Sequence, residues 1–246
     1  MAVQLTGFGS SLRYALLQVC AKVGIGVDGN EELNRRLRGY PSNHIYRLHN
    51  GLILPSPQLA RRMKKVVSLY SADMCSFMDV GCCRGGYVLE AARRPACGLA
   101  VGVDVWEPFI ELAESARQVM GIQSARFHNV SHEEVAEHLD EYGGPFHTVL
   151  NLGTYHYLFW GSERHKNGTL DHRRVFAALD KLCSNRLIIS CRLQLDRCPT
   201  FIRQRAAAMS QPPDYDKEHF LLAAREFFEP RQVGHLGSSP LFLMTK

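Results

Sequence analysis

Apolar residues in the first part of the chain recur with helical spacing in two stretches. Over 10–23 they share one face, and over 56–70 an N-cap serine and a first-turn proline precede the apolar stripe. Between these stretches we predict a short polar helix over 31–38 and an irregular segment over 41–55. Residues 1–70 are therefore expected to form an N-terminal helical cap.

From position 76 onward, short apolar runs alternate with helical periods, which is the pattern of a parallel sheet covered on both faces. The predicted strands are 76–81, 99–104, 124–128, 146–152 and 186–191. An insertion over 192–215 then carries one helix. A last helix over 216–228 precedes a hairpin whose strands, 232–235 and 240–245, are joined through Gly237.

This order of elements predicts an α/β fold. We expect a doubly wound, mostly parallel seven-stranded sheet with helices on both faces and a C-terminal β-hairpin. Since 246 residues suit one α/β domain with a small cap, residues 71–246 are expected to form that domain.

Composition adds little to this picture. With 29 Lys and Arg against 24 Asp and Glu, the net charge of +5 agrees with an anionic partner or with surplus surface cations, and nucleic acid stays open as a partner. The eight cysteines form no C-x-x-C pair, so we predict reduced thiols and no metal site. Arg13 interrupts the apolar stretch near the N-terminus, and no apolar run reaches about 18 residues; we expect no signal peptide, no membrane span and a cytoplasmic protein.

The residues that indicate a ligand site lie in 76–87, where an apolar run ends at Asp79 and a glycine-rich turn follows. A second apolar run ends at Asp104. Two strands that end in carboxylates beside a glycine-rich turn indicate a pocket for a nucleoside-bearing cofactor. The spacing is G-x-x-x-G-G, with Cys83 where a dinucleotide-binding loop has its second glycine, which argues against NAD and for a cofactor without phosphates.

Over about 66–246 the pattern resembles the class I S-adenosylmethionine-dependent methyltransferases. The resemblance implies S-adenosylmethionine as cofactor and S-adenosylhomocysteine as product. Asp79 would orient the loop or meet the cofactor's amino group through water, and Gly81 would lie against the methionine part. The positions that the resemblance assigns to the cofactor are Asp79, Gly81, Cys82, Gly85, Tyr87, Asp104, Val105, Trp106, Asn129, Val130 and Asn151.

Several of these positions have a second interpretation. Asp104 would accept both ribose hydroxyls, but an acid here also favours the start of a helix. Val105 and Trp106 would pack on the adenine, although Trp106 is equally explained as core or surface cover. Asn129 stands where many members carry aspartate, and Cys83 stands where the loop often has glycine.

The loop after the fourth strand is the candidate for catalysis, with His156 as general base and Tyr155 beside it. A hydrogen-bonded structural histidine is the alternative. The acceptor is expected to meet Tyr46, Arg47 and His49 of the N-terminal segment and Arg192 of the insertion. Arg197, Arg203 and Arg205 follow Arg192 as phosphate or carboxylate binders, or as a solvated helix face.

Other signatures are not found. No Asn-Pro-Pro-Tyr-type tetrapeptide follows the fourth strand, which disfavours base-flipping methylation, and no ribose-methyltransferase tetrad is recognisable. The sequence therefore predicts methyl transfer to oxygen or nitrogen of a small molecule, with sugars and phosphorylated glycans among the candidates. An RNA-modifying methyltransferase and a non-catalytic binding subunit are the alternatives.

Overall fold

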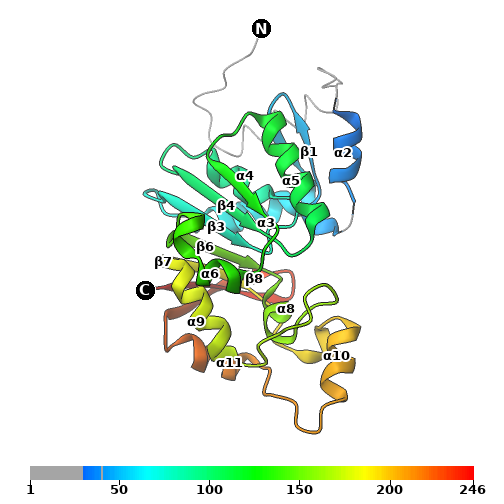
Figure 1. Ribbon diagram of the computed structural model, residues 1–246, viewed down its shortest axis with the longest axis vertical. Helices are drawn as coiled ribbons and strands as arrows, with labels where there is room; N and C mark the ends of the chain where they lie inside the picture. The colour runs from blue at the N-terminus through cyan, green and yellow to red at the C-terminus, as the bar shows by residue number, and fades with distance from the viewer. Residues whose placement is uncertain (1–29, 40) are drawn as a thin grey trace.

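The computed structural model describes residues 30–39 and 41–246, so the helix predicted over 10–23 lies outside the described residues. A seven-stranded sheet with the order β5-β4-β3-β6-β7-β9-β8 forms the centre (Figure 1). β9 is antiparallel to both of its neighbours, β7 and β8, and the other strands of this sheet are parallel to one another. Its strands are β3 (Ser76–Val80), β4 (Leu99–Val103), β5 (Ala125–His128), β6 (Phe146–Leu152), β7 (Cys183–Ser190), β8 (Glu229–Leu236) and β9 (Ser239–Thr245).

Helices cover both faces of this sheet, as the sequence predicts. In Figure 1, α2, α4 and α5 lie above the sheet, and α9, α10 and α11 lie below it. The upper elements are α2 (Glu31–Leu37), α3 (Pro57–Val67), α4 (Gly86–Ala92) and α5 (Glu107–Met120), and the 3₁₀ turn η1 (Ser42–His44) leads into this half. The others are α6 (His132–Glu137), α7 (Leu139–Tyr142), α8 (Tyr155–Trp160), α9 (His172–Leu182), α10 (Thr200–Ala207), α11 (Lys217–Ala224) and the 3₁₀ turn η2 (Leu195–Arg197).

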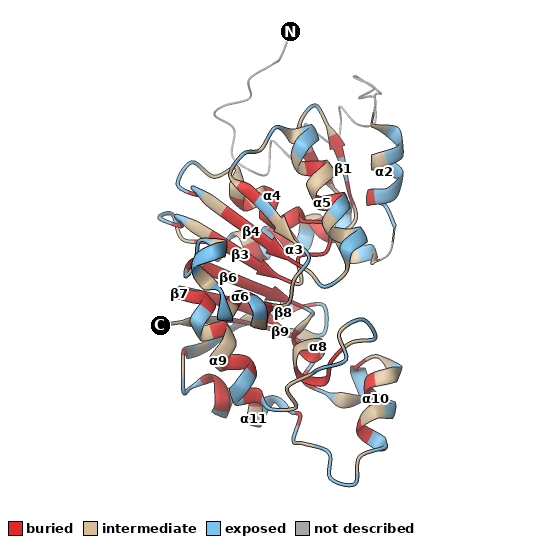
Figure 2. Ribbon diagram, viewed as in Figure 1, coloured by how far each residue is buried: buried red, intermediate tan, exposed pale blue. Residues whose placement is uncertain are grey.

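The core consists of two apolar clusters, one on each face of the sheet. Successive side chains of a strand point to opposite faces of the sheet. Leu187 and Ile189 therefore belong to the cluster on the α9 side, and Ile188 belongs to the cluster on the side of α3 and α4. The central strands are buried on both sides, as Figure 2 shows. This explains why they read as continuous apolar runs rather than alternating ones.

The segment 41–55 differs from its prediction as irregular. It contains an antiparallel hairpin of β1 (Tyr46–His49) and β2 (Leu52–Pro55). Asn50 and Gly51 at its turn both have positive φ, 50° and 67°, which is the conformation that favours Asn-Gly in two-residue hairpin turns. The Asn-Gly pair was therefore a hairpin signal in the sequence that the prediction overlooked. The short helices α7 and α8 were also not predicted.

The helix starts agree better with the sequence. The Ser56 hydroxyl accepts a hydrogen bond from the Leu59 amide (3.2 Å), so α3 begins at the predicted serine and proline. The Ser131 hydroxyl accepts from the Glu134 amide (3.1 Å) and starts α6 in the same way. Both caps are local interactions, which is why the sequence shows them.

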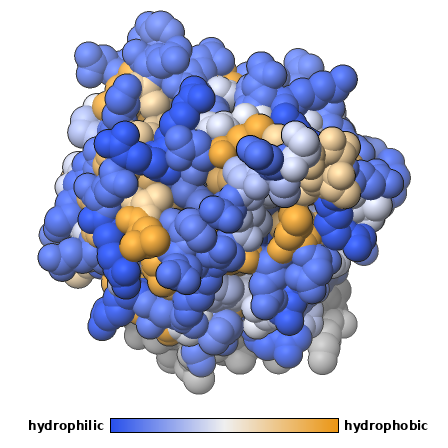
Figure 3. Space-filling view, turned by 90° about the horizontal axis from the view of Figure 1, so that it is seen from below, coloured by the Kyte–Doolittle hydropathy of each residue, from blue (hydrophilic) through white to orange (hydrophobic). Residues whose placement is uncertain are grey.

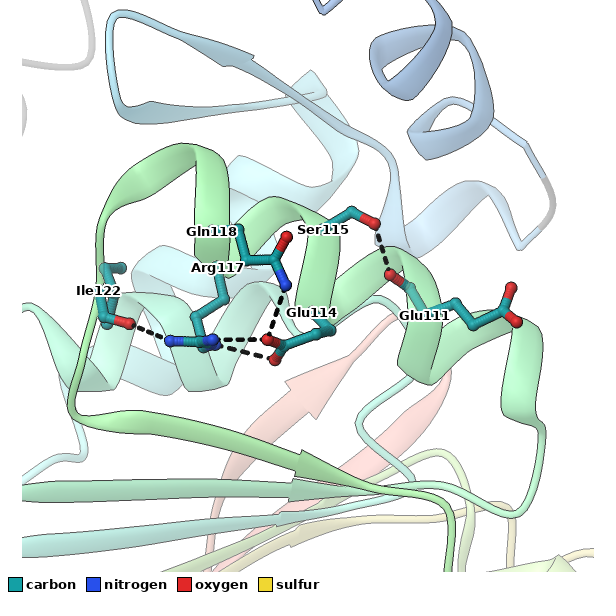
Figure 4. A network of polar contacts seen from close by, with 6 residues as sticks. All are labelled: Glu111, Glu114, Ser115, Arg117, Gln118 and Ile122. Atoms are coloured by element: carbon teal, nitrogen blue, oxygen red, sulfur yellow. Dashed lines mark hydrogen bonds and ion pairs between the residues drawn. The ribbon is translucent and has the colours of Figure 1, made fainter.

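Helix α5, which begins just after Asp104, ends in a network of polar contacts (Figure 4). The Arg117 guanidinium donates two hydrogen bonds to the Glu114 carboxylate, at 2.8 and 2.5 Å, and a third to the Ile122 carbonyl at 2.9 Å. That carbonyl lies beyond Gly121, which ends the helix with φ 65°. The network therefore fixes the turn by which α5 leads into β5.

The face of the molecule shown in Figure 3 is largely hydrophilic, and the hydrophobic areas visible on it are small and separate. Within residues 30–39 and 41–246, no helix has both the length and the apolar character needed to cross a bilayer.

Phe176 on α9 offers a test of the lower core. Its side chain is fully buried, and its ring lies 5.1 Å from that of Phe220. Phe176→Ala is expected to lower the free energy of unfolding by about 3–5 kcal/mol, because the cavity left behind adds to the lost burial. Urea denaturation measures this loss. Leu222→Ala, at a side chain 53% exposed, is the control and should change it by no more than about 0.5 kcal/mol. Equal effects of the two substitutions would contradict this packing.

Candidate functional site

A cavity of about 630 Å³ opens at the carboxyl ends of the parallel strands. Gly81 after β3, Asp104 after β4, Gly153 after β6 and Arg192 after β7 all line it. In open α/β sheets ligands bind at this edge, beside the point where the strand order reverses. Here that point lies between β3 and β6. The edge of the sheet at which the sequence predicts a site therefore carries a cavity.

The glycine-rich turn passes close to the neighbouring strand. The amides of Gly81 and Cys82 both donate to the Val103 carbonyl at 2.9 Å. Gly81 has φ 76°, and a Cβ atom there would overlap the methyl group of Thr154. Cys83 also has positive φ, 52°, which L-residues rarely adopt. Cys83 thus takes a conformation that suits the glycine more usual at this position.

Asp104 is held by the same turn. Its Oδ2 accepts from the Cys83 amide and its Oδ1 from the Trp106 amide, each at 3.0 Å. A carboxylate has about four acceptor positions, so Asp104 can accept further hydrogen bonds from a ligand in the cavity that it lines. Burial raises the pKa of Asp104, while these backbone hydrogen bonds act in the opposite direction. The arrangement suits a ligand with two neighbouring hydroxyl groups.

Trp106 lies on the same side of the cavity, under the loop that joins α8 to α9. The Arg164 guanidinium carbon sits 3.9 Å above the centre of the Trp106 ring, a cation–π contact. Val105 and Val130 line the cavity nearby, and Val105 is exposed. Phe109 also packs edge-on against the Trp106 ring at 4.0 Å, so the aliphatic side chains provide the apolar part of this wall.

His156 faces the cavity from α8. Its side chain is 1% exposed, and neither ring nitrogen has a hydrogen-bond partner within the described part of the chain. Burial, together with the nearby positive charge of Arg192, lowers the pKa of His156 to about 3. The imidazole is therefore neutral near pH 7, with one nitrogen free to donate and the other free to accept.

Tyr155 lies next to His156 but points elsewhere. Its hydroxyl shares a 2.6 Å hydrogen bond with Nδ1 of His172, and its ring packs against Phe220 in the lower core. The Tyr155 side chain is fully buried and does not line the cavity. The structure thus brings only one of the two predicted catalytic residues to the cavity.

Two predicted polar residues lie beneath the cavity rather than in its wall. Asp79 is 2% exposed, and burial, with the neighbouring Asp104 carboxylate, raises the pKa of Asp79 well above its usual range. The Asn151 amide donates to Thr154 Oγ1 (2.7 Å) and to the Val80 carbonyl (3.3 Å). Both residues thus lie where they support the loops that line the cavity.

The remaining predicted cofactor residues do not line the cavity either. Cys82, Gly85 and Tyr87 are buried in or after the glycine-rich turn. Asn129 is exposed, and its amide donates to the Asp104 carbonyl at 2.8 Å, which fixes the end of β4.

The N-terminal wall differs from the expected one. Tyr46 is buried and its hydroxyl donates to the Arg84 carbonyl (2.5 Å), while Arg47 and His49 lie on β1 away from the cavity. The lining residues from this part of the chain are Pro41, Ser42, Asn43, His44, Gln58 and Arg62. Gln58 and Arg62 are one helical turn apart on α3, and that spacing beside the buried stripe was their only signal in the sequence.

A metal centre is not evident in the described residues, because no three His, Cys, Asp or Glu side chains there are grouped so that they could hold an ion.

Comparisons with known proteins were made on sequence and on structure. No family model matches the chain, and no curated protein matches it in sequence. Among solved structures, WbdD is similar with a TM-score of 0.60 at 19% identity. That match covers 87% of this chain and 40% of the WbdD chain, so the chain spans two fifths of that relative.

Two other solved structures carry methyltransferase names. Magnesium protoporphyrin IX methyltransferase (ChlM) from Synechocystis PCC 6803, with bound SAH, matches with a TM-score of 0.53 at 14% identity, over 95% of this chain and 99% of its own. An O-methyltransferase family protein from Burkholderia thailandensis matches with a TM-score of 0.51 at 16% identity, over 76% and 56%. Similarity at these identities concerns the fold: this chain has the class I methyltransferase fold.

The protonation of His156 can be observed directly. We expect its ring to stay neutral from about pH 8 down to about pH 5, because its pKa of about 3 lies below that range. His219 is an internal control, since its hydrogen bond to the Asp216 carboxylate raises the pKa of His219. Histidine ring signals in NMR titrations should separate the two. A midpoint for His156 above about pH 6 would contradict the burial described above.

The same shift predicts a sign for stability. The unfolded chain binds a proton at His156 near the ordinary pKa of about 6.5, and the folded chain only near 3. The contribution of His156 to folding stability is therefore present above about pH 6.5. It declines as the pH falls, by at most about 1.4 kcal/mol per pH unit.

Proposed function

We propose that this protein is a methyltransferase that uses S-adenosylmethionine and methylates oxygen or nitrogen of a small molecule. The observation that carries the proposal is Asp104, whose carboxylate lines the cavity of a methyltransferase fold and is oriented there by backbone amides. The two hydroxyl groups of a ribose are donors that a carboxylate accepts. The cofactor-bound methyltransferase neighbour, ChlM with SAH, supports the same assignment.

The cavity wall fits the parts of this cofactor. Gly81 gives the methionine part a surface without a side chain, and Val105 with Val130 gives the adenine an apolar surface beside Trp106. Arg62 lies beside the Tyr87 hydroxyl, over the helix that follows the glycine-rich turn. Its guanidinium is thus placed to pair with the carboxylate of the methionine part.

The sulfonium cofactor supplies an electrophilic methyl group and leaves as a neutral thioether. The chain must therefore place the acceptor in line with the methyl group, exclude water and receive one proton. His156 is the group for the last task, because it lines the cavity and its ring nitrogens are buried without a hydrogen-bond partner among the described residues. Methylation turns a hydroxyl oxygen into an oxonium whose proton is strongly acidic, so even a weakly basic imidazole accepts it.

The first prediction concerns the cofactor. Asp104→Ala removes the ribose acceptor and an anchor of the glycine-rich turn, and is expected to weaken binding of S-adenosylhomocysteine at least about 100-fold, as for the loss of two charged hydrogen bonds. Calorimetric titration measures the affinity. Asp140→Ala, at an exposed aspartate of α7, should bind as the parent protein does. Undiminished binding by Asp104→Ala, with the fold intact, would refute the role of Asp104.

The second prediction concerns the acceptor step. His156→Gln retains a hydrogen-bonding side chain but no basic nitrogen. We expect methyl transfer from S-adenosylmethionine to fall about 10²- to 10⁴-fold in kcat, with S-adenosylhomocysteine affinity unchanged. A panel of hydroxyl and amine acceptors with labelled cofactor supplies the assay. Equal loss in cofactor affinity and in turnover would instead show that His156 only maintains the cavity.

A further inference from the structure

We infer that a second cavity beside the cofactor cavity binds an oxyanion, phosphate or carboxylate, carried by the acceptor, and that Arg192 and Arg197 hold it. The inference rests on the proposed function, because it names the class of acceptor that this methyltransferase would modify. It defines a bifunctional substrate with a nucleophile at one end and a negative charge at the other.

The second cavity has a volume of about 530 Å³ and lies next to the first at the carboxyl edge of the sheet. The two cavities share the lining residues Arg192, Ser238 and Ser239. Arg192 follows β7, Ser238 lies in the turn between β8 and β9, and Ser239 begins β9. One ligand can therefore reach from His156 past this junction into the second cavity.

The charges of the second cavity favour an anion. Arg192, Arg197 and Lys217 line it, against two carboxylates. One of these, Asp216, is already engaged, since it accepts from the amide of His219 and pairs with that ring at 2.9 Å. Glu218 is the second and is exposed. Lys217 donates to the Gln232 side chain at 2.7 Å.

The two arginines, in contrast, are exposed and have no side-chain partner among the described residues. Neither the Arg192 nor the Arg197 side chain makes a hydrogen bond or ion pair with any residue of the described ranges 30–39 and 41–246. A guanidinium donates parallel hydrogen bonds to the two oxygens of a carboxylate or phosphate, and a cavity that holds two such groups is suited to one oxyanion between them.

The other arginines of 192–215 are engaged in the structure itself. Arg205 donates to the carbonyls of Trp160 and Lys166 and so ties the loop after α8 to α10. Arg203 donates to the Thr200 hydroxyl at 3.1 Å. Of four arginines that look equivalent in the sequence, two thus make hydrogen bonds within the described residues, and the other two are exposed and line the second cavity.

The cofactor does not account for this site. S-adenosylmethionine carries no phosphate, and its single carboxylate belongs near the glycine-rich turn and Arg62. We therefore assign the oxyanion that Arg192 and Arg197 bind to the acceptor. Arg192 is also close enough to His156 for its charge to lower the pKa of that ring. The anion subsite and the reacting group are thus neighbours.

The test uses the whole protein saturated with S-adenosylhomocysteine and inorganic phosphate as the probe. At constant ionic strength, the ³¹P line width of phosphate should broaden saturably with protein. Arg192→Gln and Arg197→Gln should each weaken this binding at least about tenfold, as expected for the loss of a charged hydrogen bond. Arg174→Gln, at an exposed arginine of α9 that lines neither cavity, should leave it unchanged.

Competition with acetate distinguishes the two sources of charge. Displacement of phosphate by acetate would assign a carboxylate acceptor, and its failure would assign a phosphorylated one. Phosphate binding that is absent, or equal in all three variants, while S-adenosylhomocysteine still binds, would overturn the inference and leave the proposed function standing. Phosphate binding without any S-adenosylhomocysteine binding would instead remove the proposed function and with it the assignment of the anion to an acceptor.

Discussion

The end of β4 holds the glycine-rich turn, and the rest of the site depends on this contact. Three successive amides, those of Gly81, Cys82 and Cys83, donate to two neighbouring residues, Val103 and Asp104. The first and third residues of this turn have positive φ, and the Thr154 side chain leaves no room for a Cβ at Gly81. The same contact orients Asp104, so the loop and the carboxylate form one unit.

This unit explains why the fold and the site can be read from the same residues. The strands that end in acids, the glycines and the helix caps are local features, and the structure confirms the sheet, its two covered faces and the closing hairpin. The hairpin at Asn50-Gly51 was missed although its turn signal was present, because the flanking strands have only four residues each and β2 does not alternate between apolar and polar residues.

The side-chain directions were harder to predict. Tyr155 and His156 are adjacent on α8, and which of them faces the cavity depends on the rotation of that helix, which is set by packing against residues distant in the chain. Likewise Tyr46 and Arg47 alternate on β1, so the former is buried and the latter exposed, and neither reaches the cavity. Arg62 lies on α3 and Arg164 in the loop between α8 and α9, and neither segment has a sequence motif that indicates a cofactor site.

Arg192 connects the two halves of the proposed site. Its positive charge adds to burial in keeping His156 neutral, so the free protein holds an imidazole that is a poor base. An oxyanion bound between Arg192 and Arg197 would compensate that charge, and the imidazole would then feel only burial. The basicity of His156 would thus rise when an anionic acceptor occupies both cavities. A neutral molecule of the same shape would leave His156 as it is, so the charge recognised in one cavity would favour proton transfer in the other.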